Sequence, residues 1–170
     1  GLYLANLLEK EKDLDYKIFE KRSKLNLEQG YGIQLSVNSI KLLNKIGFKN
    51  ITASDIFFPT KVNFFKSNNP NKICDIDLTQ FNDDLNRYTT TKRTTLLKFL
   101  LKNIPEHKIK FNISINNLDY SNDIKVCFSD ESEANFDFLI IADGVFSQSK
   151  LIISKESLKA KYNNCMALRG

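Results

Sequence analysis

Hydrophobic residues recur every three or four positions in three stretches of the chain, the period of an α-helix with one buried face. The first stretch opens the chain with "GLYLANLLEKEK", the second runs from Ser36 to Gly47, and the third is "TTTKRTTLLKFLLKNIP". Ser36 is a good N-terminal cap, Gly47 is a good stop, and Pro105 cannot continue a helix. The pattern therefore predicts three amphipathic helices, with Arg93 in the first turn of the third.

Shorter stretches alternate or group their apolar residues as β-strands do. A buried strand is predicted from Leu14 to Glu20, and a hairpin is predicted where "KVNFFKS" and "KICDIDL" flank the turn "NNPN". Two more strands follow in "KIKFNISI" and "DIKVCFS", and a buried one in "FDFLIIADG", which ends at Asp143. Helix followed by strand predicts an α/β fold, with a β-α-β unit whose first strand lies before residue 1. A further strand is predicted near Met166.

The composition narrows the class of protein. The 170 residues are 42% hydrophobic, which is enough for a folded domain with a core, and the net charge of +5 is spread over every segment. Because no basic block is interleaved with aromatic residues, no nucleic-acid surface is expected. No apolar run is long enough to span a bilayer and no leader opens the chain, so a cytoplasmic protein without an integral membrane segment is expected.

Cysteine and histidine are too few for several kinds of site. Cys74, Cys127 and Cys165 are odd in number and far apart, which favours neither a disulfide framework nor a metal site. His107 is the only histidine, so a catalytic triad would have little to be built from. If the protein is an enzyme, we expect a bound cofactor to supply the chemistry.

Two predicted strands end on acidic residues, at the place where ligands bind in open α/β sheets. Glu20 lies nineteen positions after Gly1, the spacing between the last glycine of a phosphate-binding turn and the acid that holds a ribose. A glutamate that only caps a loop is equally compatible, and Asp143-Gly144 also occurs in ordinary turns. Arg93 opposes the helix dipole unless an anion lies nearby, although a solvated surface arginine fits as well.

Four stretches together resemble the FAD-dependent aromatic hydroxylases, the superfamily of p-hydroxybenzoate hydroxylase and the ubiquinone-biosynthesis hydroxylases. They are "GLYLANLL…YKIFEKR", "GYGIQLSVNSIKLLNKIG", "TKRTTLLKFLL" and "FDFLIIADGVFSQSK", in the family's order and spacing. The closing "YNNCMALRG" is similar to the family's segment that ends in Arg-Gly, here Arg169 and Gly170. The resemblance covers nearly the whole chain and implies a partial Rossmann-like FAD-binding domain with an inserted β segment of a substrate domain.

The resemblance also assigns cofactor-binding residues. It makes Gly1 the third glycine of the dinucleotide fingerprint and Glu20 the acid on the adenosine ribose of FAD, flanked by Lys21 and Arg22. It places Gln34 near the flavin and Arg93 near the ribityl chain and pyrophosphate. Asp143 and Gly144 match a motif associated with FAD and the nicotinamide cofactor, and Ser147 matches the family's serine. Lys150 stands where the family usually has arginine. Lysine keeps the positive charge but lacks the bidentate fork of a guanidinium.

The implied domain division has four parts. Residues 1–50 and 81–150 would form the FAD-binding domain, residues 51–80 an inserted β segment of the substrate domain, and residues 151–170 the start of the substrate domain. Substrate choice would depend on the insert and on a C-terminal half beyond residue 170.

The implied activity is a monooxygenase that uses FAD, NADH or NADPH, and O₂ to hydroxylate a small aromatic substrate. Three alternatives remain open: another FAD-dependent oxidoreductase of this fold, such as a reductase or a halogenase; an NAD-dependent dehydrogenase; and a non-catalytic nucleotide-binding fragment. A dehydrogenase would leave the glycine loop before Gln34 and the cation at Arg93 without a role.

Overall fold

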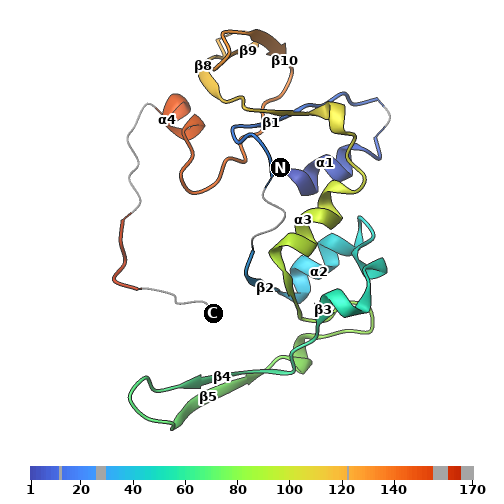
Figure 1. Ribbon diagram of the computed structural model, residues 1–170, viewed down its shortest axis with the longest axis vertical. Coiled ribbons are helices and arrows are strands. Elements are labelled where there is room, and N and C mark those ends of the chain that lie inside the picture. The colour runs from blue at the N-terminus through green and yellow to red at the C-terminus, as the bar shows by residue number, and fades with distance from the viewer. Residues whose placement is uncertain (12, 26–29, 122, 155–160, 166–170) are drawn as a thin grey trace. The chain divides into compact units, whose positions relative to one another are not determined.

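The computed structural model describes residues 1–11, 13–25, 30–121, 123–154 and 161–165 (Figure 1). The chain divides into two compact units, one formed by Gly1–Leu25 together with Asn103–Gly170 and the other by Asn26–Lys102. Helices and strands mix in both, which confirms the mixed composition expected from the sequence. Among the described residues, no helix combines the length and apolar character needed to cross a membrane.

The first unit begins with a helix and a strand, as predicted. Its elements are α1 (Leu2–Leu8), β1 (Ile18–Glu20), a 3₁₀ turn (Glu106–Lys108), β7 (Ile109–Phe111), β8 (Ile115–Asp119), β9 (Ile124–Phe128), β10 (Glu133–Phe136) and α4 (Ser149–Ser154). β1 runs parallel to β7 with Glu20 opposite Phe111, and β8, β9 and β10 form an antiparallel meander in the order β10-β9-β8. In the part of the chain that is described, β1–β7 is the one parallel pair, so the Rossmann-like arrangement stays a prediction.

Aromatic side chains join β1 to the meander. Phe19 of β1 lies with its ring centroid 4.5 Å from that of Phe128 and 5.9 Å from that of Phe136. Val126 is fully buried in the same cluster, beside Ile113. Burial of these apolar side chains fixes the position of β1, and thereby of Glu20 at its end.

The second unit contains the other elements. They are β2 (Gly32–Leu35), α2 (Val37–Asn44), 3₁₀ turns at Phe48–Asn50, Ala53–Asp55 and Thr79–Phe81, β3 (Ile56–Phe57), β4 (Lys61–Phe65), β5 (Lys72–Asp77), β6 (Thr89–Lys92) and α3 (Arg93–Leu101). β6 is the middle strand of an antiparallel sheet in the order β2-β6-β3, and β4 pairs with β5. One face of this sheet is buried, where Thr89 and Thr91 are almost inaccessible.

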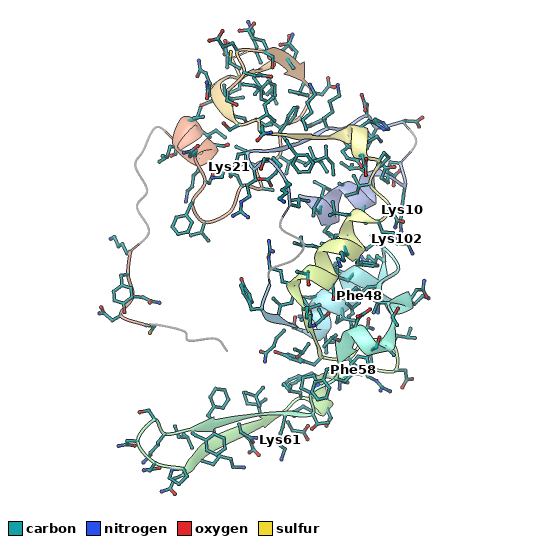
Figure 2. All side chains as sticks on the ribbon, in the orientation of Figure 1. Lys10, Lys21, Phe48, Phe58, Lys61 and Lys102 are labelled. Atoms are coloured by element: carbon teal, nitrogen blue, oxygen red, sulfur yellow. The ribbon has the colours of Figure 1, made fainter. Side chains whose placement is uncertain are left out.

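The predicted start of α2 is confirmed, and the helix ends at Asn44, three residues before the predicted stop at Gly47. The Ser36 hydroxyl oxygen accepts a hydrogen bond from the Ser39 backbone N–H at 3.4 Å, and Gly47 has the left-handed φ of 94° that favours glycine. The helix buries the apolar face predicted from its period. Phe48, the residue after Gly47, has its ring centroid 5.1 Å from that of Phe99 in α3 (Figure 2).

The predicted hairpin is also confirmed, as β4 and β5. Its Cα partners Val62–Ile76 and Phe64–Cys74 place apolar side chains on one face. The other face carries charge, because Lys61 (Figure 2) and Lys72 lie 3.5 and 2.9 Å from the Asp75 carboxylate. The predicted assignment of residues 51–80 to a substrate domain stays a prediction, as do the other domain bounds.

The prediction of a buried strand in "FDFLIIADG" is wrong for this chain. The strand of this region is β10, which ends at Phe136, and residues 138–142 have no regular secondary structure. Phe138 is 86% exposed and Ile140 is 62% exposed. A strand needs a neighbour for its backbone hydrogen bonds, and no described strand pairs with this segment. Apolar sequence alone therefore could not bury it.

Two predicted boundaries are also corrected. β1 starts only at Ile18, and Leu14 is 52% exposed, since β7 pairs with no residue before Ile18. Thr89–Lys92 is a strand rather than the start of the third helix, because its β-branched threonines pair with both β2 and β3. The predicted strand near Met166 and the Arg169-Gly170 segment lie outside the described residues.

Candidate functional site

Glu20 ends β1 and turns its carboxylate toward its own loop. Its Oε1 accepts a hydrogen bond from the Arg22 backbone N–H at 3.0 Å. The backbone carbonyls of Glu20 and Arg22 accept from the N–H groups of Ile113 and Asn112. The side chain is half-buried, and its Oε2 has no partner among the described residues, which leaves one oxygen able to accept from a ligand hydroxyl. Lys21 (Figure 2) and Arg22 are exposed beside it.

Gly1 lies against the residue that precedes Asp143. A Cβ placed on Gly1 would stand 3.8 Å from the Ala142 Cβ, which is ordinary van der Waals contact. Gly1 also begins α1, because its carbonyl accepts from the Ala5 N–H at 3.1 Å. The fold therefore brings the start of α1 next to the residue that precedes the Asp143-Gly144 turn.

Asp143 caps the turn that follows it. Its Oδ2 accepts from the Ser149 backbone N–H at 3.2 Å, at the start of α4. Burial raises the pKa of this carboxyl, but hydrogen bonds from Ser147 and Ser149 outweigh burial and leave the pKa below its usual value. Gly144 has the left-handed φ of 86°, and open space surrounds its Cβ position. The turn therefore presents an ionised carboxylate beside bare backbone.

A cleft of about 520 Å³ adjoins this turn. Its lining includes Asp143, Gly144, Ser147 and Lys150, together with apolar side chains from Ile141 and Ile153. Lys150 contributes its positive charge to the lining, and its backbone N–H donates to the Ser147 hydroxyl oxygen at 2.9 Å. A volume of this size is within the range of small-molecule sites.

Gly30 and Arg93 are packed together in the second unit. A Cβ on Gly30 would lie 3.1 Å from the Thr94 Cγ2 and 3.3 Å from the Arg93 Cβ, so a side chain would crowd the start of α3. The Arg93 N–H donates to the Tyr31 carbonyl at 3.0 Å. Arg93 is half-buried in the first turn of α3 and forms no ion pair with any described carboxylate. An uncompensated cation at this end of a helix suits an anionic ligand.

Gln34 lies on β2 directly opposite Thr90 of β6. Its Oε1 accepts a hydrogen bond from the Tyr88 hydroxyl at 3.1 Å. Sequence reasoning identified Gln34 but missed Tyr88. The available signal was the run "YTTTK", whose β-branched residues favour a strand and would have placed Tyr88, Thr90 and Lys92 on one face.

The predicted residues thus form two groups. In the first unit the fold brings Gly1 beside the Asp143-Gly144 turn, and it places Glu20 with its two basic neighbours at the end of β1. In the second unit it brings the Gly30 loop against Arg93 and places Gln34 on the strand that follows that loop.

Comparison with solved structures places the chain in a known fold. It superposes on 2,6-dihydroxypyridine-3-hydroxylase from Arthrobacter nicotinovorans with a TM-score of 0.73, at 15% identity over 92% of this chain. Klebsiella pneumoniae HpxO complexed with FAD and uric acid matches with a TM-score of 0.68, at 20% identity over 85% of the chain. FqzB matches with a TM-score of 0.72, at 18% identity over 92%. No family model matches the chain, and no curated protein matches it in sequence.

The chain spans only part of these neighbours, namely 37%, 36% and 38% of their lengths. At these identities the comparison establishes the fold. The resemblance to FAD-dependent aromatic hydroxylases, stated from sequence motifs alone, is confirmed at that level: the chain has the fold of one part of such enzymes.

Proposed function

We propose that this chain is part of an FAD-dependent monooxygenase that uses NADH or NADPH and O₂ to hydroxylate a small aromatic substrate. The observation that carries the proposal is the likeness of 85% or more of the chain to part of 2,6-dihydroxypyridine-3-hydroxylase, FqzB and HpxO, the last of which was solved with FAD and uric acid bound. The sequence motifs that carry the resemblance support it independently.

The described residues fit an FAD molecule in their donors, acceptors and charges. Glu20 has a carboxylate oxygen without a partner among the described residues, as an acid that binds ribose hydroxyls requires. Gly30 places no side chain against the start of α3. Arg93 has no carboxylate partner there among the described residues. Asp143 is held ionised by its hydrogen bonds, beside a glycine whose backbone is accessible.

Each group has a distinct task in this proposal. Glu20 accepts hydrogen bonds from the adenosine ribose, with Lys21 and Arg22 adding positive charge beside it. Arg93 neutralises part of the pyrophosphate or binds the ribityl chain, and Gln34 contacts the flavin. Asp143 and Gly144 line the crevice in which the dinucleotide lies. Gly1, at the start of α1, is the last glycine of the phosphate-binding turn.

When bound, FAD supplies the redox chemistry that takes electrons from the nicotinamide cofactor and activates O₂. The protein's part is to orient the reactants, exclude water and set the local charge. Within the same proposal, residues 51–80 with the hairpin β4–β5 belong to a substrate domain, whose next part starts at residues 151–170. Residues 1–50 and 81–150 belong to the FAD-binding domain.

The proposal is tested on a longer protein that contains this chain. We expect it to purify with a flavin absorption spectrum and to oxidise NADH or NADPH faster when an aromatic acceptor is added, with formation of a hydroxylated product detected by mass spectrometry. A flavin-containing protein that reduces or halogenates its substrate instead would support a related oxidoreductase of the same fold. A protein that binds no flavin at all would contradict the proposal.

A further inference from the structure

The second unit contains a cavity of about 170 Å³, lined by residues from α2, β3 and the loop that precedes β6. Its apolar lining includes Ile40, Phe48, Ile56 and Phe58, of which the two phenylalanines are labelled in Figure 2. A cavity of about 150 Å³ lined by apolar side chains can hold benzene. The cavity therefore has room for an apolar group of about six non-hydrogen atoms.

The cavity lies on the side of the sheet β2-β6-β3 that faces away from Gln34. Thr89 of β6 lines the cavity and is almost fully buried, whereas the next residue, Thr90, stands opposite Gln34. Because side chains alternate along a strand, Thr89 and Gln34 point to opposite faces of the sheet. Among the described residues that line the cavity, none is assigned to the cofactor. The proposed function therefore gives this cavity no role.

Arg87 brings a positive charge to the lining of the cavity. Its guanidinium carbon lies over the Phe58 ring, 5.7 Å from the ring centroid, and both residues line the cavity. Arg87 forms no ion pair with a carboxylate of the described chain, and Lys49 adds a second positive charge to the lining. A guanidinium over an aromatic ring keeps the N–H groups of its edge for a ligand, and its planar fork matches a carboxylate.

Asp84 and Asn44 add hydrogen-bond acceptors to the same lining. Asp84 is exposed and forms no ion pair with a described lysine or arginine. The Asn44 Nδ2 donates to the Leu85 carbonyl at 3.1 Å and to the Asn86 Oδ1 at 3.0 Å, which holds the loop against α2. The Asn44 Oδ1 is buried and accepts no hydrogen bond from the described residues. A buried acceptor without a donor is unfavourable, so a ligand with an ammonium group suits this part of the lining.

We propose that this cavity binds a small apolar α-amino acid in its zwitterionic form. Arg87 binds the carboxylate, Asp84 and the Asn44 Oδ1 bind the ammonium group, and the side chain of the ligand enters the apolar part of the cavity. A carboxylic acid without the ammonium group would bring a second negative charge to Asp84, and an amine without the carboxylate would bring a positive charge to Arg87. Only the zwitterion complements both charges. The inference goes beyond the proposed function and does not depend on it.

The test compares L-valine with the two molecules that lack one of its charged groups. 3-Methylbutanoate lacks the ammonium group, and 2-methylpropylamine lacks the carboxylate. The 170-residue chain is labelled with ¹³C at its isoleucine methyl groups, and the signals of Ile40 and Ile56 are assigned by their loss in Ile40→Val and Ile56→Val. We expect L-valine to shift both signals in a saturable way and to leave the signal of Ile109, in the other unit, unchanged. Each of the other two molecules should bind about tenfold more weakly or worse.

Variants separate the roles of the two charged side chains. Arg87→Gln should weaken L-valine binding about tenfold or more, because a charge-assisted pair with the carboxylate is lost. Asp84→Asn should weaken L-valine but strengthen 3-methylbutanoate, because it removes a negative charge that only an ammonium group can use. Lys98→Gln, at an exposed position of α3, and Asp15→Asn, exposed in the first unit, are the matched controls and should leave the affinity for L-valine unchanged.

Three results would overturn the inference. They are the absence of a saturable shift of Ile40 and Ile56 with L-valine, an equal affinity for L-valine and 3-methylbutanoate, and an equal affinity for L-valine in Arg87→Gln and Lys98→Gln. The comparison of the three molecules needs no substitution, so it decides the matter even where a variant does not fold. A longer protein that held FAD and hydroxylated its substrate would leave the proposed function standing while this inference failed. Binding of L-valine by a longer protein that held no flavin would contradict only the proposed function.

Discussion

Glu20 has one carboxylate oxygen bound to its own loop and one without a described partner, so its replacement should affect ligand binding more than folding. In a longer protein containing this chain, we expect Glu20→Ala to weaken FAD binding by about 2–3 kcal/mol, the size of charge-assisted hydrogen bonds to a ribose. Titration of the apo-protein with FAD measures the change. Glu11→Ala, at an exposed position, is the control, and an unchanged dissociation constant for Glu20→Ala would remove Glu20 from the site.

Arg93 and Arg87 provide a matched comparison within the second unit. Arg93 is half-buried in the first turn of α3 without a described carboxylate partner, whereas Arg87 is exposed over the Phe58 ring at 5.7 Å. We expect Arg93→Leu to lower flavin affinity about tenfold or more and Arg87→Leu to change it little, because only the first removes charge from the proposed anion site. Similar effects of both substitutions, in flavin affinity and in the rate of flavin reduction, would make Arg93 an ordinary surface residue.

Glu9, Tyr16 and Lys108 form a polar cluster that should give the chain a pH-dependent stability. The Glu9 Oε1 accepts from the Lys108 Nζ at 2.7 Å and from the Tyr16 hydroxyl at 2.6 Å. These hydrogen bonds lower the pKa of Glu9, so the contribution of Glu9 to the stability of the fold is lost as pH falls through that lowered pKa. Burial and the bond to Glu9 raise the pKa of Tyr16, so its contribution is present below the usual value of 10.0 and declines as pH rises further.

Glu9→Gln should therefore make the unfolding free energy depend less steeply on pH, both in acid and above pH 10. Chemical denaturation of the 170-residue chain between pH 2 and 5 and above pH 10 measures it. Glu11→Gln, which is exposed and lies outside the cluster, should keep the slopes of the unmodified chain. Equal slopes in the two variants would show that the cluster does not persist in solution.

At the scale of elements, the junction between the Gly30 loop and α3 is the tightest glycine contact in the described chain. We expect Gly30→Ala to destabilise the chain by about 1 kcal/mol, because a Cβ there would push against Thr94 and Arg93. Gly32→Ala, two residues later, meets no atom within 4 Å and should be nearly neutral. Denaturant midpoints of the two variants measure this, and a Gly30→Ala protein as stable as Gly32→Ala would mean that the loop does not lie against α3.

In the same region, the local sequence was sufficient to predict the helices but not the strand β6. The helical period of residues 93–104 and the cap at Ser36 were sufficient to predict α3 and α2. The threonines at 89–91 were assigned to the helix, because local period cannot reveal that β2 and β3 lie on both sides of them. Tyr88 was missed for that reason, since its side chain faces Gln34 only once β6 is a strand.

At the scale of the whole molecule, we expect the 170-residue chain, expressed alone, to hold FAD more weakly than a longer protein. The resemblance places the phosphate-binding turn and its strand before residue 1, between β1 and the segment 138–142. That segment pairs with no described strand and exposes Phe138 and Ile140. The turn would also supply the backbone N–H groups that bind the pyrophosphate.

The flavin absorption spectrum of the purified chain measures this directly. Stoichiometric, tightly bound FAD would show that the upstream strand is dispensable or that Gly1 is not the last glycine of the turn. Recovery of FAD binding only after upstream residues are added would support the alignment. The exposed apolar segment further predicts that the isolated chain aggregates more readily than the longer one.

The sequence by itself determined the features that depend on neighbours along the chain: the start of α2, the β4–β5 hairpin, the position of Arg93 at the start of α3, and the order of motifs that resembles the FAD-dependent hydroxylases. Only the tertiary structure decided which residues meet across the fold, including Gly30 with Arg93, Tyr88 with Gln34, and Gly1 with Ala142. It also decided that residues 138–142 are not a strand here. The reason is physical, because helix caps, turns and hairpins are formed by hydrogen bonds between residues near in sequence, whereas a strand outside a hairpin exists only when a distant segment pairs with its backbone.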